Sequence, residues 1–514
     1  MAADQELQRP SLEHPPEDPD AHGNPEDDDD EEVDDDEEEE EEAPNELLGR
    51  LSDGTVRVRV HDVVIRGNVV TKESIIEAEV ADLFRSVSTL KELVQAAATA
   101  NAMLRQLGIF DSVSITLDAG PPELTDTANV VIQLVEAKNP LTGDIGIYTR
   151  PEARTWTLEG SLKRKNYFGY GDIWDASLAY GWDQTTELGV GVYLPRFRVL
   201  SSPLSARISL LTQDWLKFSS YKEHLLGLSL GLFSKRQHDL SYNLTWRALA
   251  DPSQMASKSV RRQLGHNLLS SIKYTFKVDH RDSFLRPRTG YAFLSTTQIA
   301  GLGPDSKSVR FLRQEFDLRG ALPLDFYNAA LNVGVSAGFV MPWGRGFMNN
   351  CSPLPDRFFM GGHSSPVCTL AGPTSLLGFK FRGLGPTDSR RHIPSRTGSG
   401  SEDSTASPGR DVLGGDIAVT AFADVSFDLP LKLFREAGIH GHAFLCVGNL
   451  AKLLPQELKS FSLHKFRETV RSSAGFGLII PTKLFRMEIN YCYILKQFEH
   501  DQGKTGIQFN FSSP

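Results

Sequence analysis

The sequence predicts a mainly β protein, in which a sixteen-stranded antiparallel transmembrane β-barrel follows one small α/β module and a disordered acidic tail. Two observations predict this class. Apolar and polar residues alternate in segment after segment of the C-terminal three quarters of the chain, and a shorter region before them has helical periodicity. The expected domains are the tail at 1–50, the module at 51–138 and the barrel at 140–514, with a long loop at 342–413.

The N-terminal tail is strongly acidic. Residues 1–50 hold 23 of the 66 acidic residues and two bases, Arg9 and Arg50, which gives a net charge of −21. Residues 26–42 are all Asp or Glu except Val33. Such a run repels itself and buries no apolar surface, so we expect it to be disordered. It is either a solvated tail, the interpretation we favour, or a weak collector for basic segments of incoming polypeptides.

A compact α/β module precedes the barrel region. Alternating valines and a continuing apolar run at 56–65 predict a first strand, and a short helix is expected from Thr71. Thr89 and Glu92 form a capping box at the start of a second helix, which Gly108 ends. Three strands leave a free sheet edge, which is able to accept a strand of another chain. The second and third strands are expected at 110–117 and 130–135.

The strand array follows from period-two alternation, which places successive side chains on opposite faces of a sheet. In 331–341 and 485–493, for example, apolar residues alternate with small, polar or charged ones. An even number of strands is typical of a closed antiparallel membrane barrel. The sixteen expected strands lie near 142–149, 154–162, 172–181, 185–194, 203–213, 221–232, 237–247, 265–277, 289–300, 308–319, 329–341, 414–428, 438–448, 469–480, 485–495 and 504–512.

Two architectures fit this alternation. A soluble sandwich or barrel turns its apolar face inward, whereas a membrane barrel turns it toward lipid and encloses a polar lumen. We favour the membrane barrel because the polar faces carry many glycines and charged rows, and because aromatic residues gather near segment ends. No stretch reaches the roughly 18 consecutive apolar residues of a membrane-spanning helix. Membrane-spanning strands alternate apolar and polar residues, so they contain no such run.

No catalytic, cofactor or metal site is predicted, and no nucleotide or nucleic-acid motif is present. The four cysteines stand far apart without the paired spacing of a zinc site. We favour unpaired thiols over a bridge between Cys351 and Cys368. The N-terminus has the features of neither a secretory signal nor an Arg-rich matrix-targeting peptide.

The connection at 342–413 is far longer than ordinary loops, which suggests either a function or disorder. It divides into two parts of different composition. Residues 356–386 are rich in Gly, Phe and Arg, whereas 387–410 have the Ser, Thr, Gly and Arg composition of a flexible insertion. We therefore expect the first part to carry the function.

Several segments resemble the BamA-like outer-membrane β-barrel insertase superfamily. Residues 504–511, Lys-Thr-Gly-Ile-Gln-Phe-Asn-Phe, match the mitochondrial β-signal at every defined position and lie at the last strand. Residues 356–362, 372–379 and 383–386 resemble the long loop of that superfamily, and 104–113 resemble the end of a polypeptide-transport-associated (POTRA) repeat. Together these segments resemble the core barrel subunit of the mitochondrial sorting and assembly machinery, which has one POTRA module and sixteen strands.

The resemblance implies that β-barrel precursors are inserted and assembled into the mitochondrial outer membrane through a lateral gate between the first and last strands. No reaction is catalysed. The implied partners are precursor proteins, accessory subunits of an assembly complex and the lipid bilayer, with the POTRA module in the intermembrane space. Glycines at the gate either weaken the strand ladder or relieve crowding in the lumen, and both remain open. The implied gate residues are Thr142, Gly143, Ile145, Gly146 and Tyr148, with Lys504, Gly506, Phe509 and Phe511 opposite.

The resemblance also implies that the long loop folds into the lumen. In the family an arginine of an Arg-Gly-Phe or Arg-Gly-Tyr motif anchors this loop, but Leu377 stands at that position here. Lys380 or Arg382 is a candidate substitute, against an inward acid such as Asp424. The loop motif comprises Asp356, Arg357, Phe358, Gly361, Gly362, Leu377, Gly378, Phe379, Arg382 and Gly383.

Three other functions were weighed. A passive metabolite pore shares the barrel but gives no reason for the module or the long loop. A protein-import channel of the chloroplast outer envelope belongs to the same superfamily, but such chains usually carry several POTRA repeats and a transit peptide. A soluble β-rich binding protein is the third. The alternative we retain is a protein-import or metabolite channel of a chloroplast or mitochondrial outer membrane.

Overall fold

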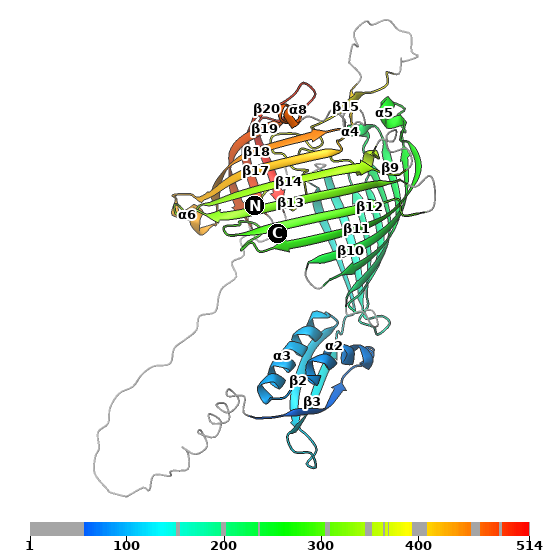
Figure 1. Ribbon diagram of the computed structural model, residues 1–514, viewed down its shortest axis with the longest axis vertical. Helices are drawn as coiled ribbons and strands as arrows, with labels where there is room; N and C mark the ends of the chain where they lie inside the picture. The colour runs from blue at the N-terminus through cyan, green and yellow to red at the C-terminus, as the bar shows by residue number, and fades with distance from the viewer. Residues whose placement is uncertain are drawn as a thin grey trace, which may run out of the picture.

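The structure is mainly β and consists of an N-terminal module and a large barrel (Figure 1). Cys351 and the predicted acidic tail lie outside the described residues, and so does most of the predicted insertion at 387–410. The computed structural model describes residues 56–150, 155–196, 202–234, 237–303, 309–344, 352–362, 365–368, 370–392, 409–453, 463–482 and 486–512.

The module is a three-stranded sheet in the order β1-β3-β2, with two helices packed against it. β1 and β3 are parallel, and β2 and β3 are antiparallel. Both helices bury one apolar face, and Ile76, Leu93, Leu104, Val130 and Ile132 form the centre of the shared core. The elements are β1 (Arg59–Arg66), α2 (Glu73–Arg85), α3 (Leu90–Gln106), β2 (Phe110–Ala119) and β3 (Thr127–Glu136).

Two local details of the module differ from the sequence prediction. β1 begins three residues later than the alternation suggests, because the backbone before it pairs with the start of α3; Leu90 N donates to the carbonyl of Val56 at 3.0 Å. The capping box is present with an additional contact. Glu92 N donates to Thr89 Oγ1 at 3.3 Å, and the Glu92 carboxylate accepts from Ser88 N at 2.9 Å as well as from the backbone of Thr89.

Sixteen antiparallel strands form one sheet in which each strand pairs with its neighbours in chain order, and this confirms the predicted barrel class. Every predicted strand segment overlaps one of them. They are β4 (Leu141–Arg150), β5 (Thr155–Lys165), β6 (Ile173–Gly181), β7 (Thr186–Leu194), β8 (Leu204–Asp214), β9 (Lys222–Phe233), β10 (His238–Ala250), β11 (Gly265–Asp279), β12 (Gly290–Ala300), β13 (Phe311–Pro323), β14 (Ala330–Pro342), β17 (Ile417–Asp428), β18 (His440–Ala451), β19 (Arg471–Pro481), β20 (Arg486–Lys496) and β21 (Gly506–Ser512).

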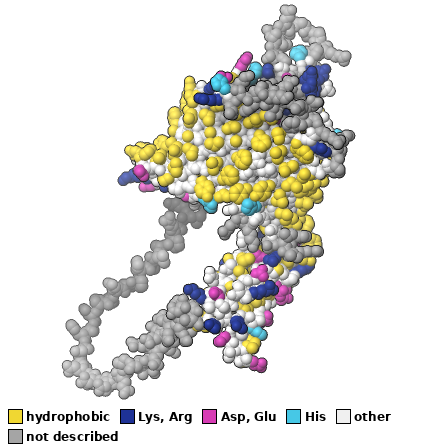
Figure 2. Space-filling model, in the orientation of Figure 1, with side chains coloured by type: hydrophobic (Ala, Val, Ile, Leu, Met, Phe, Trp, Pro, Cys, Tyr) yellow, Lys and Arg dark blue, Asp and Glu magenta, His cyan; other side chains and the backbone are white. Residues whose placement is uncertain are grey.

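The apolar face of this sheet points outward. Leu318 and Val335 are each 53% exposed, whereas Asp317, on the same strand as Leu318, is fully buried. Figure 2 shows the result as a broad band of hydrophobic side chains across the visible face of the barrel. This arrangement is the lipid-facing one of the two architectures that the alternation allows. None of the described helices has the length and apolar character needed to cross a membrane.

The barrel has two different ends. Its strands alternate in direction, so the connections alternate between a near mouth, which faces the module, and a far mouth. The near mouth carries α6 (Lys432–Glu436). The far mouth has longer connections, which contain α4 (Leu216–Ser219), α5 (Lys258–Arg261), α8 (Leu463–Glu468), the turn η1 (Leu354–Asp356) and a small hairpin of β15 (Thr387–Ser389) and β16 (Arg410–Val412).

Candidate functional site at the barrel seam

β4 and β21 are the two ends of the sheet. β4 pairs along its length with β5, and β21 pairs with β20 from Cys492↔Gly506 to Arg486↔Ser512. In the described strands no backbone ladder joins β4 to β21. All the gate residues predicted for the first strand lie in β4. Those predicted for the last strand lie in β21, except Lys504, which precedes it by two residues.

The seam strands keep the same sidedness as the rest of the wall. Ile145 on β4 is 85% exposed, and Phe509 on β21 is 58% exposed. On the inward face of β21, Gln508 and Asn510 are buried, and Asn510 Nδ2 lies 3.5 Å from Glu488 Oε2 of β20. The outer rim of the seam is therefore apolar, and a polar contact joins β21 to β20 on the inner face.

Gly506 has a backbone that favours glycine. Its φ is +107°, in the region that L side chains rarely adopt, while a Cβ built there meets nothing within 4 Å. Gly143 differs, because its φ is ordinary and a Cβ would lie 3.5 Å from Leu162 Cδ1. At Gly506 the need for glycine is thus conformational, at the point where the chain bends into β21.

The long loop is anchored at the far mouth by its first motif residues. Arg247 of β10 forms an ion pair with Asp356 at 2.8 Å and a second one with Glu223 of β9 at 3.0 Å. Arg357 is buried and donates to the carbonyls of Ser352 at 2.7 Å and Leu413 at 3.1 Å. Charged groups withdrawn from water are stable when paired in this way.

From there the loop crosses the lumen. Arg281, in the near-mouth turn between β11 and β12, donates to the carbonyl of Val367 at 2.9 Å, and Cys368 Sγ donates to the carbonyl of Leu285 at 3.6 Å. Burial raises the pKa of the Cys368 thiol. Along the way the loop packs Phe358 against the barrel wall with 1% exposure. The described residues of the loop thus contact the barrel at both mouths.

Leu377 occupies an apolar socket. It is 1% exposed and belongs to one buried cluster with Phe444, Cys446 and Cys492 of β18 and β20. Ser473 of β19, between those strands, donates to the Leu377 carbonyl at 2.5 Å. Where the family has an arginine, this loop is therefore held by a buried leucine side chain and by a hydrogen bond to the leucine's backbone carbonyl. The alternation places these three wall residues on inward faces, but nothing in the sequence connects them to Leu377.

The candidate substitutes for the missing arginine lie elsewhere. Arg382 is buried between two aromatic rings, 3.5 Å from the centre of Trp215 and 3.8 Å from that of Phe359. Lys380 is exposed. Asp424, the acid considered for pairing, contacts His442 Nδ1 at 2.7 Å.

The tip of the loop is hydrogen-bonded to the segment that leads into the last strand. Lys504 N donates to the carbonyl of Gly378 at 2.7 Å, Lys380 N to that of Gln502 at 2.9 Å, and Gln502 N to that of Gly383 at 2.8 Å. Phe379 and Gly503 form an isolated antiparallel bridge between them. Sequence reasoning named the loop residues but missed Gln502 and Gly503, which carry no motif.

The module contacts the barrel beside the first strand. Lys72 N donates to the carbonyl of Gly169, in the β5–β6 turn, at 2.9 Å, and Asn166 Nδ2 donates to Thr71 Oγ1 at 2.7 Å. Thr71 N and Oγ1 also donate to Glu136 at 2.7 and 2.6 Å. Although partial burial raises the pKa of Glu136, these hydrogen bonds outweigh it and lower the pKa below its usual value.

The described residues contain no group of three or more His, Cys, Asp or Glu placed to hold a metal ion. The arrangement at the seam offers backbone edges and apolar side chains, and so it is suited to pairing with a polypeptide strand.

Comparisons with known proteins agree on this fold. The model of the Omp85 superfamily domain matches residues 166–513. The human sorting and assembly machinery component 50 homolog is 27% identical over 454 residues, which cover 85% of this chain and 86% of that protein. A SAM50-like protein of Schizosaccharomyces pombe is 24% identical and covers 82% of each chain. The crystal structure of BamA from Haemophilus ducreyi lacking POTRA domains 1–3 has a TM-score of 0.69, with 15% identity over 88% of this chain and 84% of that one.

Proposed function

Because the chain belongs to the Omp85 superfamily, we propose that it inserts and assembles β-barrel precursors into the mitochondrial outer membrane. The similarity to sorting and assembly machinery component 50 homologs and to BamA confirms the resemblance found in the sequence. We further propose that precursors enter through a lateral gate between β4 and β21. The alternative plastid location is less well supported, since the curated relatives named above are sorting and assembly machinery proteins.

The observation that carries the proposal is the pair of sheet ends at the seam. β4 and β21 each have one strand partner among the described residues, so each has one edge of backbone N–H and C=O groups outside any ladder. In lipid every such unsatisfied group costs several kcal/mol. A precursor strand that arrives at this edge satisfies its own backbone groups and those of the edge together. Insertion then draws on the folding free energy of the precursor, and no catalysed reaction is needed.

The two edges are not equivalent, and this supports β4 as the acceptor. β21 is held by β20, by the loop tip through the contacts at 502–504, and by the Asn510–Glu488 contact. β4 is held by β5 alone in the described strands. A precursor's β-signal, which has the pattern of 504–511, would therefore pair with the open edge of β4.

The filled lumen supports an insertase over a passive metabolite pore. The loop crosses the barrel from the far mouth to the near mouth, and Phe358, Met360 and Phe379 are buried inside it with at most 1% exposure. A barrel whose interior holds a packed apolar cluster offers a poor path for hydrated solutes.

We also propose on which side of the membrane the module lies. The module at the near mouth would lie in the intermembrane space, contact precursors there and meet accessory subunits of an assembly complex. Its contacts with the β5–β6 turn, one strand away from β4, place it close to the proposed gate.

Cysteine crosslinking tests the gate. Ile147→Cys on β4 is expected to form a disulfide with a cysteine in the last strand of an arrested precursor. Leu318→Cys on β13 is the matched control, because both leucine-sized side chains are exposed on the outer wall, at 68% and 53%. The unmodified chain measures background from the native cysteines. If a folded barrel traps precursors no better at Ile147→Cys than at Leu318→Cys, the gate is at another place.

A further inference from the structure

The far mouth carries a compact platform on one side of the barrel. It consists of the β8–β9 loop (215–221), the β10–β11 loop (251–264) and the hairpin β15–β16. The two loops share a small apolar core, which includes Tyr221 and Val260 at 0% and 1% exposure, and Leu413, directly after the hairpin, belongs to it as well. Figure 1 shows α4, α5 and β15 close together at the top of the barrel. Because it has its own core, the platform holds its surface side chains in fixed places.

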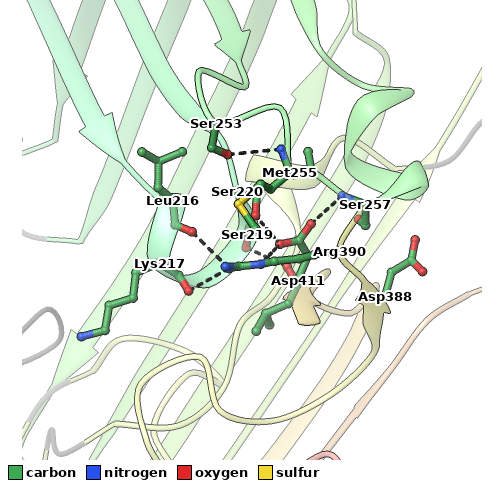
Figure 3. A network of polar contacts seen from close by, with 12 residues as sticks. Leu216, Lys217, Ser219, Ser220, Ser253, Met255, Ser257, Asp388, Arg390 and Asp411 are labelled. Carbon is green, nitrogen blue, oxygen red and sulfur yellow. Dashed lines mark hydrogen bonds and ion pairs between the residues drawn. The ribbon is translucent and has the colours of Figure 1, made fainter. Parts of the chain in front are cut away.

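One carboxylate at the centre of the platform points inward. Asp411 of β16 accepts hydrogen bonds from Ser220 Oγ at 2.6 Å and from Ser257 N at 2.7 Å, and it pairs with Arg390 Nε at 2.8 Å (Figure 3). Arg390 also donates to the carbonyl of Leu216 at 3.1 Å. Asp411 thus joins the hairpin to both loops and is not available to neutralise the surface bases.

Two further carboxylates are engaged in the same way. Asp388 of β15 accepts from Ser259 N at 3.2 Å, and Asp251 accepts from Ser253 N at 3.1 Å and from Ala256 N at 2.9 Å. All three acidic groups therefore bond to the backbone or side chains of the platform itself. Hydrogen bonds to a charged group are stronger than neutral ones, so these acids stay turned inward.

The basic side chains point the other way. Lys258, Arg261 and Arg262 are exposed at positions i, i+3 and i+4 of the α5 turn, which puts them on one face, while Val260 is buried on the other. Lys217, Arg391 and Arg410 are exposed nearby, and the Lys217 side chain extends away from the network in Figure 3. Among the described residues none of these six bases lies within ion-pair distance of a carboxylate, although Arg410 donates to Thr387 Oγ1 at 2.8 Å and its charge helps to lower the pKa of Asp388.

The basic patch borders the membrane. Arg262 is three residues from Gly265, where β11 enters the apolar band, and at this level Trp246 stacks on His266 with ring centres 5.1 Å apart. Exposed aromatic rings mark the headgroup level of a bilayer. In Figure 2, Lys and Arg side chains gather above the hydrophobic band at this end of the barrel.

We propose that Lys258, Arg261 and Arg262, together with Lys217, Arg391 and Arg410, bind the phosphate headgroups of anionic phospholipids in the leaflet at the far mouth. Each base near a membrane surface raises the affinity for anionic lipid about fivefold, so three on one face give about a hundredfold.

Lipid titration of the full-length protein in a zwitterionic detergent tests the proposal. Short-chain phosphatidylserine is expected to bind the wild-type protein, and phosphatidylcholine is not. K258Q/R261Q/R262Q is expected to weaken phosphatidylserine binding about a hundredfold. K432Q/R435Q is the matched control, because it removes two exposed bases from α6 at the near mouth, and it is expected to bind like the wild type. Heat-dependent gel mobility of the barrel verifies that each variant is folded.

Two further probes show whether the patch prefers a lipid headgroup to a free phosphate or to an acidic polypeptide. Inorganic phosphate and an acidic peptide are titrated against the same proteins, and both are expected to bind far more weakly than phosphatidylserine. A tighter acidic peptide would show a polypeptide-binding patch and overturn the proposal. Equal binding of phosphatidylserine by the folded K258Q/R261Q/R262Q and wild-type proteins would overturn it as well.

Discussion

The seam and the opposite wall of the barrel are built from the same alternating pattern but are held together differently. In the wall, β13 has 13 residues and pairs with β12 on one side and β14 on the other, so both backbone edges are satisfied. At the seam, β21 has 7 residues and pairs with β20 alone. The side chains of the two regions are similar, with apolar residues outward and polar residues inward.

Outward apolar side chains are alike in the wall and at the seam, so they do not account for this difference. The distinction lies in backbone pairing and in the loop tip, which binds the segment before β21 from inside. We therefore expect substitutions at the seam and at the loop tip to reduce stability and assembly more than equivalent substitutions in the wall.

Deletion of residues 504–511 is expected to have the largest effect. Without them β20 becomes an unpaired edge in lipid, and the loop tip loses its partner at Lys504. Membrane assembly of the protein itself is expected to be lost, as measured by resistance to carbonate extraction and by heat-dependent gel mobility. Deletion of the eight residues 398–405, between β15 and β16, is the control and is expected to leave assembly intact. Equal assembly of both deletions would show that β21 is dispensable.

Substitution in the socket of the loop tip is expected to be next in size. Leu377→Ala removes a side chain that is 1% exposed, and both the transfer term and the cavity term apply, at about 2–5 kcal/mol. Leu318→Ala in the wall removes a leucine that is 53% exposed, and there detergent or lipid chains fill the space, so the cavity term is absent. Urea unfolding in micelles measures both. An equal loss at the two positions would mean that the socket does not hold the loop.

The barrel class could be predicted from sequence because its signal is local and repeated. In β13, for instance, Leu312, Phe316 and Leu318 alternate with charged residues within a single strand. All sixteen segments were found in this way, with differences at their ends. The resemblance to the insertase superfamily then predicted which loop and which strands form the site.

The contacts of the site could not be predicted, because they join residues far apart in the chain. Leu377 meets Ser473, 96 residues later, and Thr71 meets Asn166, 95 residues later. The sequence has Leu377 at the position of the family's anchoring arginine, with Lys380 or Arg382 as the candidate substitute. In the structure the barrel wall supplies an apolar socket and a hydroxyl donor there, which only the pairing of β18, β19 and β20 brings together.

The smallest of these effects is expected at the bend into β21, where two glycines offer a matched pair. A Cβ meets nothing within 4 Å at either Gly506 or Gly160, but Gly506 alone has a positive φ, of +107°. Gly506→Ala is therefore expected to cost about 1–3 kcal/mol through backbone strain, whereas Gly160→Ala on β5 is expected to be nearly neutral. The midpoint of urea unfolding and the yield of assembled barrel measure the two. If both alanine variants have the urea midpoint and the assembly yield of the wild type, the bend tolerates an ordinary residue. The seam then differs from the wall only in its missing ladder and in the loop contacts.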